Sequence, residues 1–200
     1  HISRLFLGLP MHCVQCHDHK TEAWYQEDYY NMAAFLTNVK SKGIYQNDVN
    51  GNRRIVGYDI VDEHEGSISI PGESKQSQPI LLDGTKYNGP QKKKREVLAK
   101  WITDKKNPYF SQAIVNRVWT QLMGKGFVEP LDGFGEENPP SHPKLLNWLA
   151  EDFRIHGYDM SYLMKTILNT DAYQRSSQTN KNNKNDEDFY SHAYLKPLTA

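Results

Sequence analysis

The residues that could do chemistry gather near the start of the chain, where both of its cysteines stand. Cys13, Cys16 and His17 form the pattern C-x-x-C-H, the attachment pattern of c-type haem. Two thioether bonds must reach two vinyl groups on one edge of the porphyrin, and a two-residue gap on a helical turn brings both sulfurs to one side. The imidazole of His17 can then bind the iron as proximal ligand. The spacing therefore predicts haem c on these three side chains, with a further group accepting the other ring N–H of His17.

Other interpretations of the same residues stay open. The two thiols could form a redox couple, although no βαβ pattern accompanies them. They could instead bind zinc or another single metal ion in a site made of Cys13, Cys16, His17 and His19, with His12 as a further candidate. Zinc sites usually collect their ligands from two separated pairs, whereas these candidates are crowded together. The thiols could also be purely structural.

A haem would leave the sixth position of the iron to another residue. Met11 and His19 lie too close in sequence to the motif to reach the opposite face of the iron. The remaining methionines and histidines that could do so are Met32, His64, Met123, His142, His156, Met160 and Met164. For the methionines, helical spacing favours a role in core filling, and for the histidines we expect surface or capping positions.

Apolar periodicity predicts a mainly α fold, in which two helical subdomains are joined by a small β-rich connector. The subdomains cover residues 1–43 and 91–200, and the connector covers 44–90. Helices are expected over 2–9, 26–40, 92–104, 107–124, 141–157 and 159–168, and strands over 54–61 and 66–70. Pro10 is expected to end or bend the first helix, Gly51 and Asn52 to form a turn, and Asp159 to cap the last helix. Aromatic bulk beside the cysteine motif is expected from Trp24, Tyr25 and Tyr30. In the helix that begins after Asn107 the predicted apolar stripe is Phe110, Ile114, Val118 and Leu122.

Charged residues outside the cysteine motif fit structural roles best. Arg117 is predicted to form an ion pair with the acidic loop that contains Asp132, Glu136 and Glu137. The basic run at 92–95 is interpreted as the polar start of an amphipathic helix, because apolar residues follow it at once. No nucleophile elbow, phosphate-binding glycine loop or metalloprotease motif is present, so the sequence leaves open whether the protein is an enzyme.

Composition narrows the classes of partner. The chain of 200 residues has 24 Lys and Arg against 24 Asp and Glu, so a general nucleic-acid binder is not expected. No apolar run is long enough for a membrane span. The chain opens at His1 without a leader, and we expect it to be an internal piece of a longer polypeptide. A redox partner protein and the rest of that polypeptide are the partners expected.

The order of several motifs resembles a known pair of domains. The first part resembles the end of the planctomycete-type cytochrome-like domain through Phe6–Leu9, Cys13–Lys20 and Gln26–Tyr30. The second resembles the start of the uncharacterised helical domain that follows it, through 116–119, 126–130, 132–135, 138–143, 146–150 and 173–177. The resemblance implies an extracytoplasmic bacterial protein, periplasmic or secreted, with haem carried by Cys13, Cys16 and His17. A scaffold of a secreted polysaccharide-acting or polysaccharide-binding protein is the alternative.

Overall fold

The structure is a computed structural model that describes residues 1–62 and 65–195. The chain divides into two compact units. One consists of His1–His12 together with the chain from Ile102 onward, and the other is Cys13–Trp101. Among the described residues, no helix is both long enough and apolar enough to cross a membrane.

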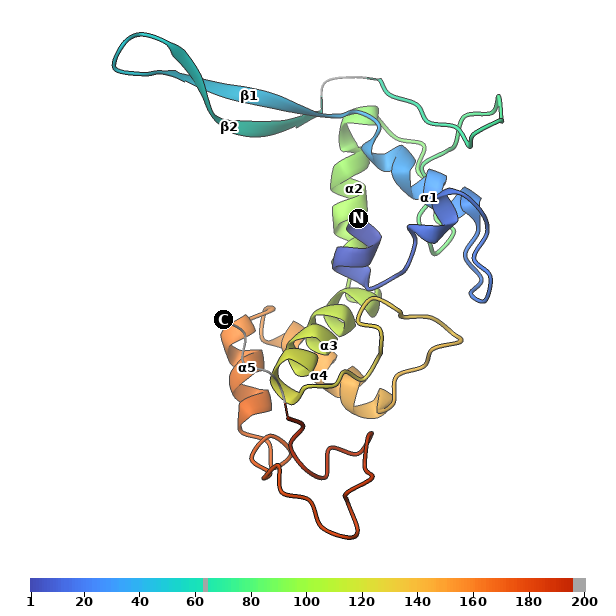
Figure 1. Cartoon of the computed structure of the whole chain (residues 1–200). Helices are drawn as coiled ribbons and strands as arrows, with labels where there is room; N and C mark the ends of the chain where they lie inside the picture. The colour runs from blue at the N-terminus through green and yellow to red at the C-terminus, as the bar shows by residue number, and fades with distance from the viewer. Residues whose placement is uncertain (63–64, 196–200) are drawn as a thin grey trace. The chain divides into compact units, whose positions relative to one another are not determined.

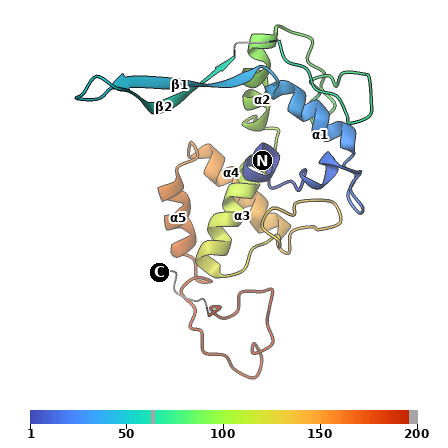
Figure 2. The same ribbon diagram turned by 45° about the horizontal axis from the view of Figure 1, so that its top comes forward.

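The unit Cys13–Trp101 combines short helices with one antiparallel pair of strands (Figure 1). Its first elements are the 3₁₀ turn η2 (Cys13–Gln15), helix α1 (Gln26–Ala33) and the 3₁₀ turn η3 (Ala34–Leu36). Strands β1 (Val39–Asn47) and β2 (Arg53–Asp62) follow, then η4 (Gln91–Lys93) and α2 (Lys94–Ile102). Both views show the two strands as a long twisted ribbon (Figure 2). The small β-rich part of the prediction is confirmed.

Two details of this unit differ from the prediction. The helix expected over 26–40 ends at Leu36, because Thr37 and Asn38 turn their side chains to other segments: Thr37 Oγ1 donates to the carbonyl of Gly66 at 2.8 Å, and Asn38 Nδ2 donates to that of Gln91 at 3.1 Å. Val39 then begins a strand that the sequence analysis missed. The strand expected over 66–70 is wrong, since only one bridge, Ser69 with Gln76, forms there.

The other unit is helical and is centred on α3 (Tyr109–Met123). The π-helical turn η1 (Ser3–Leu7), α4 (Pro143–Ile155) and α5 (Met160–Leu168) all contact α3. The side chains of Trp119, Leu146, Leu163 and Ile167 are buried, and so is that of Leu7. The N-terminal turn thus contributes to the core of a unit whose other elements begin a hundred residues later.

The apolar stripe predicted on α3 is shifted by one position. Ser111, Val115, Trp119 and Met123 are buried, as are Ala113 and Asn116, whereas Ile114 and Val118 are half-buried. Asn116 is the reason, because its amide is fully buried and satisfies the backbone of the following loop. Its Oδ1 accepts from the N–H groups of Phe127 and Val128, at 2.8 and 3.1 Å, and its Nδ2 donates to the carbonyl of Val128 at 2.9 Å.

The N-terminal turn ends at Gly8, before the proline that was expected to stop it. Gly8 has φ +68°, a left-handed conformation that favours glycine, and a Cβ here would lie 2.6 Å from the ring of Phe134. The carbonyl of Gly8 also accepts from the N–H of Phe134 at 3.1 Å. This close approach holds the loop after α3 against the start of the chain.

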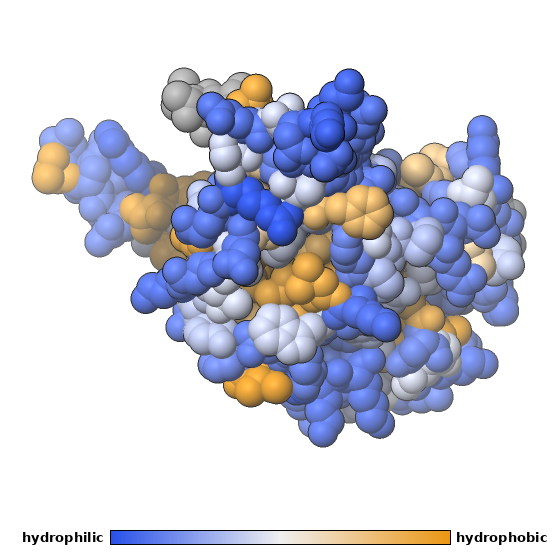
Figure 3. All heavy atoms as spheres, turned by 90° about the horizontal axis from the view of Figure 1, so that it is seen from below, coloured by the Kyte–Doolittle hydropathy of each residue, from blue (hydrophilic) through white to orange (hydrophobic). Residues whose placement is uncertain are grey.

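On the face drawn in Figure 3, hydrophobic side chains form small patches among hydrophilic ones.

Candidate functional site

The C-x-x-C-H segment folds as a tight turn with one buried anchor. Val14 is completely buried, and the backbone around it forms the 3₁₀ turn η2. Cys13 is half-buried and Cys16 is exposed, and neither cysteine is in a disulfide. The N–H of Cys16 donates to the carbonyl of Cys13 at 3.4 Å. The helical turn expected from the spacing is therefore present, and the second sulfur is open to solvent.

The imidazole of His17 is exposed and is oriented by the backbone of the next residue. Its Nδ1 lies 2.7 Å from the carbonyl oxygen of Asp18. Because a carbonyl oxygen can only accept, Nδ1 must carry the proton in this contact. The lone pair of a neutral imidazole is then on Nε2, to which no described residue bonds. This is the tautomer that binds a metal through Nε2, and the Asp18 carbonyl supplies the acceptor that the sequence could not identify.

In His19 the hydrogen-bonding role of Nδ1 is reversed, because this nitrogen accepts instead of donating. Its Nδ1 accepts from the backbone N–H of Glu22 at 3.0 Å and from that of Thr21 at 3.3 Å. In the neutral ring the proton is therefore on Nε2. The lone pair of Nδ1 is used in these hydrogen bonds, so neither nitrogen has a lone pair left for a metal ion. His19 stabilises the turn that leads to Trp24, whose carbonyl accepts from the N–H of His19 at 2.8 Å.

Three hydrogen bonds hold the motif against the first turns of α1. Asp18 Oδ1 accepts from the N–H of Gln26 at 2.8 Å, and the carbonyl of Gln15 accepts from Gln26 Nε2 at 3.0 Å and from the Tyr30 hydroxyl at 3.3 Å. Tyr30 was expected to add only aromatic bulk beside the motif, and these polar contacts were not predicted. No local pattern reveals the first one, because Asp18 and Gln26 are eight positions apart.

Tyr29 lies next to Tyr30 on the first turns of α1. Burial is the main cause that raises the pKa of Tyr29, and the neighbouring Tyr30 and Cys16 raise it further. The rings of Tyr29 and Tyr30 meet edge to face, with centroids 5.2 Å apart. An aromatic pair therefore stands beside the exposed sulfur.

The candidates for a sixth iron ligand are distributed over both units. Met32 belongs to the same unit as the motif and is buried. Met123, His142, His156, Met160 and Met164 belong to the other unit, and His64 lies outside the described residues. Core filling is confirmed for Met32 and Met123 but is wrong for Met160 and Met164, which are 44% and 41% exposed because they lie on the outer side of α5. His142 and His156 occupy the two cap positions of α4.

The zinc-like alternative finds no preformed cluster. Within 1–62 and 65–195, no group of three or more His, Cys, Asp or Glu side chains is placed to hold a metal ion. The segment does offer two thiols and one imidazole, with the Nε2 of His17 unbonded, close together in the chain.

Arg117 forms the ion pair predicted for it. Its guanidinium binds one carboxylate oxygen of Asp132, and Arg4 Nε binds the other at 2.7 Å. Arg117 also donates to the carbonyls of Leu5 and Arg4. Burial works against the ionised carboxylate, but the hydrogen bonds and charges of the two arginines outweigh it and lower the pKa of Asp132.

Comparison with known proteins places both parts of the chain. Residues 1–41 match the family described as PSCyt2, protein of unknown function (DUF1549). Residues 94–200, more than half of the chain, match the family described as PSD1, protein of unknown function (DUF1553). No curated protein and no solved structure matches the chain. The coarser part of the resemblance is thus confirmed, in that both are planctomycete-type domains of large proteins. The chain belongs to the PSD1 family, proteins of unknown function (DUF1553).

Proposed function

We propose that the chain carries a c-type haem on Cys13, Cys16 and His17 and acts as an electron-transfer module of a larger extracytoplasmic protein. The observation that supports this most is the state of His17. Its Nδ1–H is held by the Asp18 carbonyl at 2.7 Å, so Nε2 offers its lone pair to solvent, on the residue directly after an exposed cysteine.

The residues have separate roles in this proposal. The thiols of Cys13 and Cys16 each add their S–H across a vinyl group, so that sulfur and hydrogen both end on the porphyrin and no atom is lost. Nε2 of His17 is the proximal ligand, and the Asp18 carbonyl keeps the ring in the required tautomer. When bound, haem iron supplies one-electron chemistry. Attachment by such thioether bonds takes place outside the cytoplasm, which is the basis for the proposed location.

The chain offers matched variants to test the proposal. The protein is produced in the periplasm of a host that carries a cytochrome c maturation system, and its intact mass and absorbance spectrum are recorded. We expect the mass of one haem per chain and a Soret band that acid–acetone extraction does not remove. The variant with Cys13→Ser and Cys16→Ser should lack both, whereas His19→Gln should keep both.

Two results would contradict haem attachment. The first is a colourless protein whose two thiols are both titratable. The second is one zinc per chain by elemental analysis with no iron, which would support the metal-ion alternative instead. Loss of haem in His19→Gln but not in His17→Gln would overturn the assignment of the proximal ligand.

A further inference from the structure

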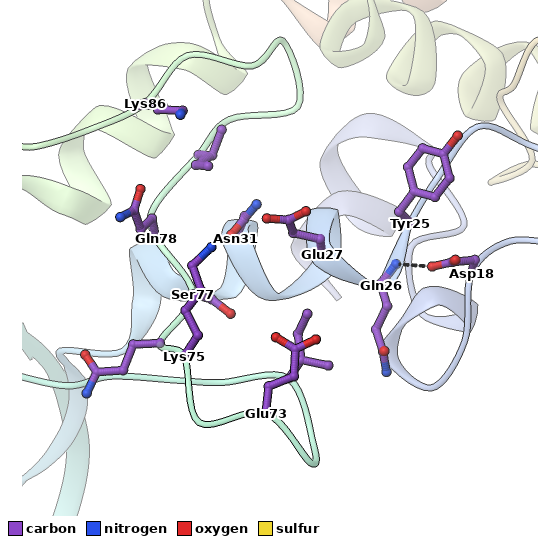
Figure 4. A pocket seen from close by; sticks show the side chains of 13 residues that line it. Asp18, Tyr25, Gln26, Glu27, Asn31, Glu73, Lys75, Ser77, Gln78 and Lys86 are labelled. Atoms are coloured by element: carbon purple, nitrogen blue, oxygen red, sulfur yellow. Dashed lines mark hydrogen bonds between the residues drawn. The ribbon is translucent and has the colours of Figure 1, made fainter.

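A polar cavity of about 560 Å³ lies in the unit Cys13–Trp101, between α1 and the segment 70–86 (Figure 4). Its volume is within the range of about 300–1,000 Å³ that is typical of small-molecule sites. One side is formed by Tyr25, Glu27 and Asn31, and the other side includes Glu73 and Gln78. None of Cys13, Cys16 and His17 lines it.

Asn31 is the side chain that points to a ligand. It is 7% exposed and lines the cavity, yet its amide forms no hydrogen bond with any described residue. Neither amide atom of Asn31 is sealed off from solvent, so the amide is accessible from the cavity. The amide of Asn116, elsewhere in the chain, makes three hydrogen bonds. The unused donors and acceptor of Asn31 are therefore available to a molecule in the cavity.

Three further polar side chains of the cavity, those of Glu27, Glu73 and Gln78, are also uncommitted, whereas Asp18 and Gln26 are hydrogen-bonded to each other. No described residue forms an ion pair with Glu27 or Glu73, and none bonds to the side-chain amide of Gln78. The lining holds three carboxylates, those of Asp18, Glu27 and Glu73, against two ammonium groups, those of Lys75 and Lys86. Figure 4 shows Glu27, Asn31 and Glu73 facing a common space.

This composition selects the class of ligand. An excess of carboxylates disfavours a phosphate or another anion, and the polar lining disfavours an apolar molecule. A hydroxyl group both donates and accepts, so amides and carboxylates can pair with neighbouring hydroxyls of one molecule. Tyr25 has 56% of its surface exposed, and its ring can pack against the flat C–H face of a sugar ring. We propose that the cavity binds a neutral saccharide.

Three variants of the full chain test this proposal. Saturation-transfer NMR is recorded with glucose, galactose, xylose and maltose, and with glycine and inorganic phosphate as comparison ligands. We expect at least one saccharide to bind and the comparison ligands not to bind. Asn31→Leu and Glu73→Gln should each weaken the affinity by about tenfold, the effect of losing one good hydrogen bond. Glu65→Gln, an exposed carboxylate of the same unit outside the cavity, should leave it unchanged.

Thermal unfolding separates a binding role of Asn31 from a structural one. Because its amide has no partner among the described residues, Asn31→Leu should keep or raise the melting temperature in the absence of saccharide. The proposal fails if no saccharide binds, if glycine or phosphate binds in its place, or if both cavity variants bind as well as Glu65→Gln. Since the thiols take no part, these outcomes are independent of whether haem is attached.

Discussion

Asp132 shows how a single carboxylate connects distant parts of one unit. It binds the guanidinium groups of Arg4 and Arg117, which stand far apart in the sequence. Its side chain is 21% exposed, so solvent screens these charges only in part. The loop after α3 and the first residues of the chain are thereby held to the same helix.

The lowered pKa of Asp132 predicts how stability depends on pH. A carboxyl group whose pKa is lower in the folded protein stabilises it above the unfolded pKa of 3.8, and this contribution is lost as pH falls through the folded value. We expect Asp132→Asn to reduce the free energy of unfolding by about 1–3 kcal/mol at pH 7. The gap between the variant and the native chain should close as pH is lowered from about 4 toward 2.

Urea unfolding at several pH values measures this difference. Asp171→Asn removes an exposed carboxylate for which no ion pair is described, and it should change stability by less than about 0.5 kcal/mol. A gap between Asp132→Asn and the native chain that is the same at pH 3 and at pH 7 would show that the carboxylate charge is not responsible.

At the scale of elements, α5 depends on the residue that caps its start. The Asp159 carboxylate accepts from the N–H groups of Ser161 and Tyr162 at 2.8 and 3.1 Å, as the sequence predicts for a capping residue. The helix spans only nine residues and presents Leu163 and Ile167 to the core. A short helix has few hydrogen bonds of its own, so its cap and its buried face both matter.

Replacement of the cap should therefore have a measurable cost. Asp159→Ala is expected to lower the free energy of unfolding by about 0.5–2 kcal/mol, whereas Asp159→Ser keeps an oxygen acceptor and should retain most of the stability. Urea denaturation followed by far-UV circular dichroism compares the two. Equal losses in both variants would mean that the cap contributes nothing.

For the molecule as a whole, the compact units and the family matches divide the chain differently. The PSCyt2 match covers residues 1–41, yet the structure separates His1–His12 from the rest of that stretch and joins them to the helical unit. Leu7 and Leu9 are completely buried there. The first residues are therefore part of the core of the unit that holds most of the PSD1 match.

This arrangement predicts that a residue near the N-terminus controls the stability of the helices. Leu7→Ala should lower the free energy of unfolding by about 2–5 kcal/mol, because it leaves a cavity in the core. Leu5→Ala is the matched control, since Leu5 is 57% exposed and Arg117 uses only its backbone carbonyl. Its expected effect is within about 0.5 kcal/mol.

Thermal unfolding of the three full-length chains tests this prediction. Loss of the helical signal at a lower temperature in Leu7→Ala alone is the expected result. Similar melting temperatures for Leu7→Ala and Leu5→Ala would show that the N-terminal turn does not belong to the helical core.

The sequence by itself was sufficient to predict those features whose stabilising interactions are local. The cap at Asp159, the turn at Gly51 and the helical turn of the cysteine motif each depend on residues within a few positions of one another, and all three were predicted. Only the tertiary structure decided features whose partners are distant. It ended a helix at Leu36 through Gly66 and Gln91, buried Asn116 under a later loop, and placed Leu7 in a core built from the second half of the chain. Periodicity reports which face of a segment is apolar, but it carries no information about which distant segment will cover that face.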